Sequence, residues 1–290
     1  MDRILGQSAA AAVGWSLAHG VLYVAAIYAS TALFRTEAAS VHDRNHPQII
    51  RRRMCGAGAA TLLSLAASGL LLRGWLAPAG AAEALALLGL DPRRALPSVV
   101  VSLVLVGMLF LGPLVLDNLD GAFAWAALKR IPQSLYSRPE QARDYVVGPV
   151  TEELVFRSAV VALWAAAGMS PELCIFASPV IFGVAHVHRA LSRYFSEGSP
   201  LGQVVLSTAL QLAYTTVFGW IAAALLLRTH SVAGPIAAHV FCNVQGLPDT
   251  GRIANHPQHR YLIWLAFGAG LAGFLILFEP MTRPGVFVPS

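Results

Sequence analysis

The sequence predicts an all-α membrane protein, a polytopic helical bundle with about eight transmembrane helices. Of its 290 residues, 56% are hydrophobic and only 12% are charged, and the mean hydropathy is +0.62. These values lie well outside the usual range for a soluble globular protein of this size. The apolar residues also fall into separate runs, most of them close to the ~20 residues that an apolar helix needs to cross a bilayer.

Eight such runs follow one another along the chain. They cover residues 11–34, 54–76, 97–117, 150–168, 172–190, 203–229, 232–248 and 260–280. The fourth, fifth and seventh are the weakest of the eight. No internal repeat, low-complexity tract or long linker divides the chain, so residues 1–290 are expected to form a single domain.

Basic residues are concentrated in the odd-numbered loops between these runs. The first loop, for example, contains the cluster Arg51, Arg52 and Arg53. By the positive-inside rule these loops face the cytosol and both termini face the opposite compartment. All basic residues except Lys129 are arginines scattered among the loops, without the basic stripe of a nucleic-acid-binding protein, so no nucleic-acid partner is expected.

The segment GPVTEELVFRSA, residues 148–159, leads into the fourth run and places charges at membrane depth. Such charges are costly and usually face a protein interior or a water-filled cavity, so they mark candidate functional sites. On a helix, Glu153 and Arg157 share a face in the favourable order for an ion pair, whereas Glu152 is turned about 100° away. One acid is then held by the arginine while the other is free to act. The alternative is that acids after Thr151 only cap a helix and complement its dipole.

The fifth run ends with IFGVAHVHRAL, in which His186 follows Phe182 by one helical turn. The phenyl ring could wall a pocket and orient the imidazole. The alternative is that the two side chains only pack together, as a lone intramembrane histidine is more often a satisfied structural group.

The seventh run contains GPIAAHVFCNVQGLP, in which His239 and Asn243 are four residues apart and share a helix face. Gly234 and Pro235 suit the start of this helix, and Pro248 suits its end. Hydrogen bonding between helices is the alternative role for the histidine and the asparagine.

Antiparallel threading of the spans brings these polar groups to one side of the membrane. Glu152 falls at the start of the fourth span, His186 at the end of the fifth, and His239 in the second half of the seventh. All three then lie at the arginine-rich side, which predicts one shared cavity open to the cytosol.

In order along the chain, three motifs resemble the signatures of the CAAX-processing intramembrane proteases, a family that includes bacteriocin-immunity-type members. They are EE-xxx-R at Glu152, Glu153 and Arg157, F-xxx-H at Phe182 and His186, and H-xxx-N at His239 and Asn243. FLGPL at 110–114, the following LDNLDG and HVFCN at 239–243 are similar to the eukaryotic Ras-converting branch, the type II CAAX prenyl endopeptidases.

The resemblance implies a hydrolase that removes the last three residues from prenylated CAAX proteins. Farnesylated or geranylgeranylated small GTPases of the Ras type are the implied substrates, and the endoplasmic reticulum membrane is the implied location. It places the catalytic core at about 148–248. A wide apolar interior would suit the isoprenoid chain, since each buried methylene contributes ~0.8 kcal/mol.

Peptide hydrolysis needs an activated water, a stabilised oxyanion and a proton for the leaving amine. By resemblance, Glu152 is the general base and shares the water with His186. His239 and Asn243 would donate hydrogen bonds to the oxyanion. Glu153 and Arg157 would brace the site, and Arg157 is also a candidate for attracting the terminal carboxylate of the substrate.

Three alternatives stay open. Two histidines and a glutamate could bind zinc, although the chain has no HExxH and the resemblance implies a mechanism without metal or other cofactor. Cys242 could be a thiol nucleophile, although its helix position turns it about 100° from Asn243. The same polar residues could also serve a transporter or scaffold that hydrolyses nothing.

Overall fold

The computed structural model describes residues 9–33, 45–75, 81–122, 138–195 and 197–287. Within these ranges the chain is helical, with turns and short connections between the helices and no strand. The all-α prediction is confirmed. The helices longer than one or two turns are α1 (Ala9–Ala32), α2 (Pro47–Trp75), α3 (Ala81–Leu87), α4 (Pro92–Leu109), α5 (Leu111–Leu119), α10 (Pro171–Ala185), α11 (Val187–Phe195), α12 (Leu201–Thr229), α13 (Ala233–Gln245) and α14 (Arg260–Met281).

Between α5 and α10 lies a helical run assembled from five segments. These are α7 (Pro139–Ala142), the π-helical η1 (Arg143–Val147), α8 (Gly148–Glu153), the π-helical η2 (Leu154–Ala159) and α9 (Val160–Ala166). The run corresponds to the predicted fourth span, but it begins about ten residues earlier than predicted. Glu152 therefore lies in the middle of a helix rather than at its start, and the capping alternative for the acids after Thr151 is wrong.

Six helical stretches of the described residues are long and apolar enough to cross a membrane. They are Ala9–Ala32, Pro47–Trp75, Ala82–Leu109, Pro171–Phe195, Leu201–Thr229 and Arg260–Met281. The predicted fourth and seventh spans are helical too, but one contains three charged residues and the other, α13, has only 13 residues. With these two runs, about eight helical stretches correspond to the predicted spans of a multi-pass membrane protein, and the two that do not qualify by length and composition carry most of the polar candidates.

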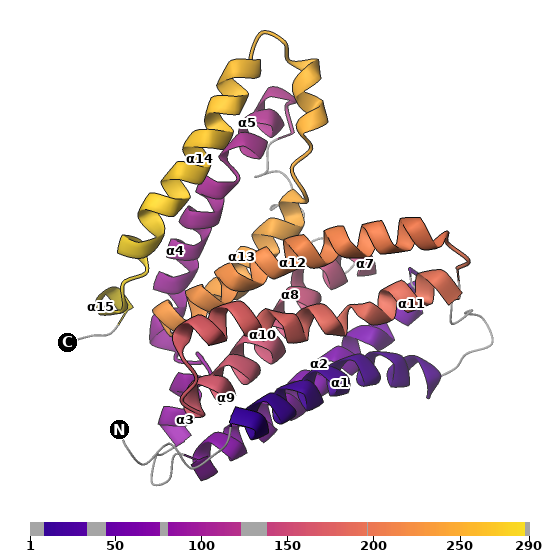
Figure 1. The fold of residues 1–290 in the computed structure, drawn as a ribbon, viewed down its shortest axis with the longest axis vertical. Coiled ribbons are helices and arrows are strands. Elements are labelled where there is room, and N and C mark those ends of the chain that lie inside the picture. The colour runs from indigo at the N-terminus through magenta and orange to yellow at the C-terminus, as the bar shows by residue number, and fades with distance from the viewer. Residues whose placement is uncertain (1–8, 34–44, 76–80, 123–137, 196, 288–290) are drawn as a thin grey trace.

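The glutamate-bearing run lies in the centre of the bundle. α1 and α2 pack against each other and against η2 and α9, while α10 pairs with α12 and also contacts α9. Every residue from Val155 to Trp164 is buried. In Figure 1, α4, α5 and α14 stand away from α12 like the second arm of a V, and α13 packs on α4 at the base.

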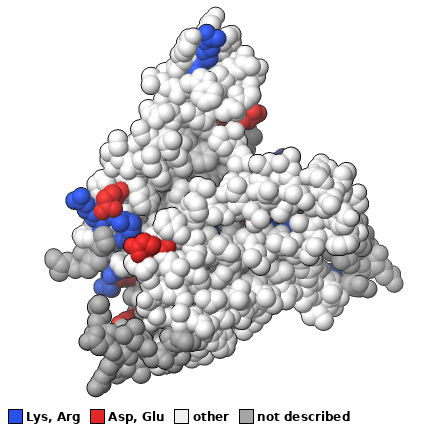
Figure 2. Space-filling view, viewed as in Figure 1, with Lys and Arg blue, Asp and Glu red and all other residues white. Residues whose placement is uncertain are grey.

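The outer surface is apolar as well, as expected for helices that face lipid. Large side chains such as Leu62, Val205 and Leu206 are more than half exposed. In the view of Figure 2 charged side chains are few: most gather near the left edge, others lie at the top and beside the upper arm, and most of the remaining surface is uncharged.

Small residues allow the helices that carry the site to approach closely. A Cβ at Gly234 of α13 would collide with the hydroxyls of Ser98 and Ser102 on α4. A Cβ at Gly219 of α12 would lie 2.6 Å from Cβ of Pro179 on α10 and 3.3 Å from Nη2 of Arg157. These glycines therefore set the distances between the walls of the site, as small residues do in many membrane bundles.

Candidate active site

The two glutamates lie between two π-helical segments, a feature that is frequent at functional sites. In η1 the N–H of Gly148 donates to the carbonyl of Arg143, five residues back. Pro149 has no N–H, so the next carbonyl, that of Asp144, loses its donor from the helix. The amide of Asn243 on α13 replaces that donor, with Nδ2 2.8 Å from the Asp144 oxygen. The bond fixes α13 to the glutamate helix beside the site.

Glu153 is fully buried and lies in a network of three charged or polar side chains. Its Oε1 accepts a hydrogen bond from Nδ1 of His239 at 2.8 Å, and its Oε2 lies 3.2 Å from Nε of Arg157. The ion pair between Glu153 and Arg157 is therefore present as predicted. Because Nδ1 donates to the Glu153 carboxylate, Nε2 on the other side of the His239 ring is turned toward Glu152, 4.0 Å from its Oε2.

Arg157 is buried and lines neither of the cavities described below. Its guanidinium carbon lies 4.6 Å from the ring centroid of Phe182 and 5.7 Å from that of Phe218, so aromatic faces surround the cation. Arg157 pairs with Glu153, and its supporting role stays a prediction based on that contact. The idea that it attracts a substrate carboxylate is wrong, because the side chain is enclosed by protein.

His186 occupies the break between α10 and α11. Its backbone N–H donates to the carbonyl of Gly183, three residues back. Its ring Nδ1 forms a 2.8 Å hydrogen bond with the carbonyl of Phe182, which in a regular α-helix would accept from the backbone N–H of His186 instead. A carbonyl can only accept, so Nδ1 carries the proton and Nε2 of the neutral ring is a free acceptor. The rings of Phe182 and His186 are 4.5 Å apart, edge to face. Phe182 therefore orients the imidazole as well as walling the pocket.

Glu152 differs from its neighbour in being open to a cavity. Its side chain is 19% exposed, and no arginine or lysine of the described chain lies within ion-pairing distance of it. Next to it, the hydroxyl of Thr151 donates to the carbonyl of Val147 at 2.7 Å and accepts from the hydroxyl of Tyr23 at 2.8 Å. Glu152 is thus held on a fixed turn with its carboxylate free.

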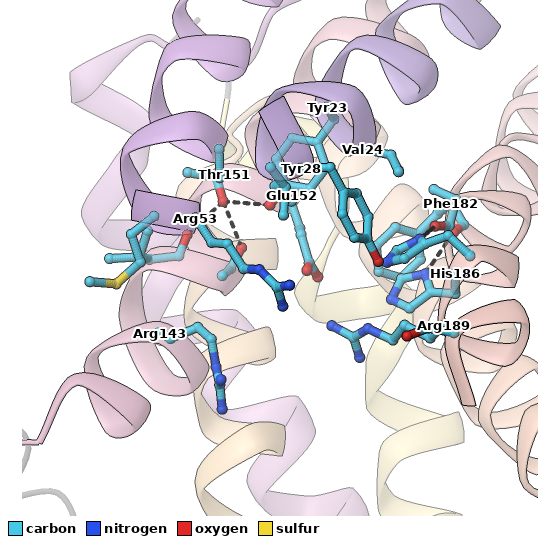
Figure 3. A pocket seen from close by; sticks show the side chains of 18 of the residues that line it. Tyr23, Val24, Tyr28, Arg53, Arg143, Thr151, Glu152, Phe182, His186 and Arg189 are labelled. Carbon is cyan, nitrogen blue, oxygen red and sulfur yellow. Dashed lines mark hydrogen bonds between the residues drawn. The ribbon is translucent and has the colours of Figure 1, made fainter. Parts of the chain in front are cut away.

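Two adjoining cavities meet at Glu152 and His186. The first, of about 550 Å³, contains the side chains of Arg53, Arg143, Arg189 and Arg193, and we call it the basic lobe (Figure 3). The second, of about 910 Å³, is walled mainly by apolar and aromatic side chains of α4, α12 and α13, and we call it the apolar lobe. Residues that line both lobes are Arg143, Gly148, Glu152, Phe182, His186, Arg189 and Gln211.

The structure thus brings the sequence-predicted site residues to one place. His239 and Asn243 line the apolar lobe beside Glu152, and Phe182 and His186 line both lobes. Glu153 and Arg157 lie directly behind this wall. The catalytic roles of these residues stay predictions, because contact alone assigns no chemistry.

Several lining residues were missed from the sequence. Tyr23 comes from the middle of the first span, and nothing in its local pattern distinguishes it from a packing residue. Arg53 and Arg189 lie in the arginine-rich loops and helix ends, where they were interpreted only as topology signals. The sequence does contain one clue to Arg53 and Arg189: the arginine-rich loops lie on the same side of the membrane as the predicted acidic site.

Cys242 also lines the apolar lobe, with its thiol free. Among the described residues, no group of three His, Cys, Asp or Glu side chains is arranged to hold a metal ion.

Comparison with known proteins gives a consistent result. The family model described as type II CAAX prenyl endopeptidase, Rce1-like, matches residues 140–245. A Homo sapiens protein named CAAX prenyl protease 2 is 34% identical over 256 residues, 84% of this chain and 75% of that protein. The Arabidopsis thaliana protein of the same name is 30% identical over 298 residues, 96% of this chain and 92% of its own length. No solved structure matches the chain significantly.

Proposed function

The chain belongs to the Rce1-like family of type II CAAX prenyl endopeptidases, and from this we propose that it is the membrane protease that removes the C-terminal tripeptide from prenylated CAAX proteins. Farnesylated or geranylgeranylated small GTPases are its proposed substrates. We propose that residues 1–290 form a single domain and that its catalytic core lies at about 148–248.

The observation that carries the proposal is the position of Glu152 and His186 at the junction of the two lobes. A prenylated cysteine stands directly before the bond to be cut, and three residues with a free carboxylate follow it. The apolar lobe on one side of the junction suits the prenyl group, and the basic lobe on the other side suits the three residues that end in the carboxylate. Side chains such as Phe110, Val217, Phe218 and Ile221 line the space for the isoprenoid.

We propose that Glu152 acts as the general base on a water held against Nε2 of His186. Glu152 removes a proton from the water, and the hydroxide attacks the carbonyl carbon of the prenylated cysteine. His239 and Asn243 then stabilise the oxyanion, His239 as the protonated imidazole and Asn243 through the N–H that Asp144 does not use. Collapse of the intermediate breaks the C–N bond, and the proton passes from Glu152 to the leaving amine.

The buried network explains why only one of the adjacent acids is free for this chemistry. Glu153 already accepts a hydrogen bond from His239 and neutralises Arg157. Its role in the proposal is to hold the His239 ring so that Nε2 faces the reaction centre. No metal takes part in the proposed mechanism.

The proposed location is the endoplasmic reticulum membrane, with the active site open to the cytosol. The choice of membrane rests on the family resemblance. The orientation is supported by the arginine-rich ends of the helices around the basic lobe, which the positive-inside rule assigns to the cytosolic face. Entry from the bilayer would deliver an isoprenoid directly to the apolar lobe.

The test is cleavage of a farnesylated CAAX peptide, and of the same peptide without the lipid, by the purified protein in detergent. We expect tripeptide release that requires the farnesyl group, persists in EDTA and persists in Cys242→Ala. Inhibition by EDTA that zinc reverses would replace the metal-free mechanism, and inactivity of Cys242→Ala would favour the thiol. If well-folded protein cleaves neither peptide, the proposed function is wrong and a transporter or scaffold role takes its place.

A further inference from the structure

The basic lobe contains more positive charge than the proposed chemistry uses. Four arginines line it, from α2, η1 and α11, against two acids, Glu152 and Glu197. Arg143 is paired with Asp144 at 2.7 Å, and Arg193 donates to the hydroxyl of Ser207 at 2.6 Å. Within the described chain, no carboxylate lies within ion-pairing distance of the other two, Arg53 and Arg189.

Arg53 is held in place without an anionic partner. Its guanidinium lies over the ring of Tyr28, 5.5 Å from the centroid, and its Nε is buried without a hydrogen-bond partner in the described structure. An unsatisfied buried donor of this kind is costly, and a ligand that accepts from it would recover the cost. In Figure 3 the guanidinium groups of Arg53 and Arg189 lie on either side of the space in front of the Glu152 carboxylate.

Paired arginines without acids form a site for a carboxylate or phosphate, because the planar guanidinium donates two parallel hydrogen bonds to such groups. The proposed substrate brings one carboxylate to this region. With its prenyl group in the apolar lobe and its scissile bond at Glu152, the three residues that follow span at most about 10 Å. Because Glu152 also lines the basic lobe, a chain of this reach can extend from the scissile bond into that lobe.

We propose that Arg53 and Arg189 bind the free C-terminal carboxylate of the substrate. This inference rests on the proposed function. The two arginines then act as specificity residues: they select chains that end three residues after the prenylated cysteine and exclude internal or carboxyl-blocked sequences.

The experiment compares two farnesylated peptides of one sequence, one with a C-terminal carboxylate and the other with a C-terminal amide. Cleavage rates are measured for the full-length protein in a nonionic detergent without anionic lipid. For the wild type we expect kcat/KM to be at least about tenfold higher with the carboxylate, from the usual strength of a charged hydrogen bond. Arg189→Gln and Arg53→Gln should lose about tenfold on the carboxylate peptide, mainly through KM, and little on the amide.

The matched control is Arg51→Gln, which removes an exposed arginine of the same helix that lines neither lobe, and it should keep the full preference. If Arg53→Gln folds poorly, Arg53→Lys takes its place in the test; because it keeps the charge, it is expected to retain part of the preference for the carboxylate peptide.

Equal cleavage of both peptides by the wild type would overturn the inference while leaving the proposed function intact. So would arginine variants that lose activity equally on both peptides. An effect of the arginines that appears only when anionic phospholipid is added would assign the lobe to lipid headgroups instead. Cleavage of neither peptide would refute the proposed function itself.

Discussion

Glu152 and Glu153 are neighbours in the sequence, but their surroundings in the fold differ. Glu153 has no exposed surface and touches Arg157 and His239, whereas the Glu152 side chain is 19% exposed to the cavities. Helix geometry explains the difference, since successive residues point about 100° apart. The sequence predicted the division of roles between a held acid and a free acid. Which acid faces His186 followed from the family resemblance and from the fold.

The first prediction concerns Glu153→Gln. The substitution leaves Arg157 buried among aromatic rings without a negative partner, a change that typically costs about 3–5 kcal/mol. We expect a clear drop in the temperature of thermal unfolding in detergent, together with lower activity. Glu152→Gln is the matched control and should unfold near the wild-type temperature. Equal stability of all three proteins would contradict the proposed bracing role of Glu153.

At the scale of elements, the sequence predicted the helices better than their irregularities. The apolar runs predicted most of the helices in order. The sequence did not predict the π-helical segments on either side of the glutamates or the break at His186. These irregularities depend on hydrogen bonds between side chains and backbone carbonyls, some of them on different helices. Pro149 was a local clue, since its missing N–H leaves the Asp144 carbonyl for Asn243. The arrival of Asn243 at that carbonyl is a tertiary contact that spacing along one helix cannot indicate.

The second prediction concerns the close approach of α12 to α10. In Gly219→Ala the added methyl would collide with Pro179 and crowd Arg157, and such overpacking costs about 1–3 kcal/mol. We expect a lower unfolding temperature and reduced cleavage, because Phe182 and Phe218 on these two helices enclose Arg157. Gly58→Ala on α2 is the control, since nothing lies within 4 Å of its added methyl, and it should be neutral or slightly stabilising. If both variants behave alike, the contact at Gly219 does not position the site.

At the scale of the whole molecule, the side of the membrane follows from the helix order. α2 and α12 begin beside the basic lobe, and α11 ends there, so the first and fifth loops share one face. The sequence indicated this common face through its arginine-rich loops. It did not indicate the V between α4 and α12 in which the apolar lobe lies, because that shape results from packing of α4 on α13 and α14.

The third prediction concerns orientation in the membrane. A cysteine placed at Glu197, which lines the basic lobe and is exposed, should react with an impermeant maleimide from the cytosolic side in a variant that otherwise lacks cysteines. A cysteine in place of Arg93, whose side chain is 81% exposed at the opposite end of the bundle, should react only from the other side. Reversed labelling of the two positions would invert the proposed orientation.

The central claim is that Glu152, at the junction of an apolar and a basic lobe, activates the water that cuts the peptide bond. The most direct test is single-turnover cleavage of a farnesylated CAAX peptide by Glu152→Gln, with thermal unfolding measured on the same preparation. Since general-base catalysis typically contributes about 10²–10⁴-fold, we predict a rate lower by at least about 10²-fold at unchanged stability. Cleavage near the wild-type rate by a well-folded Glu152→Gln protein would contradict the account.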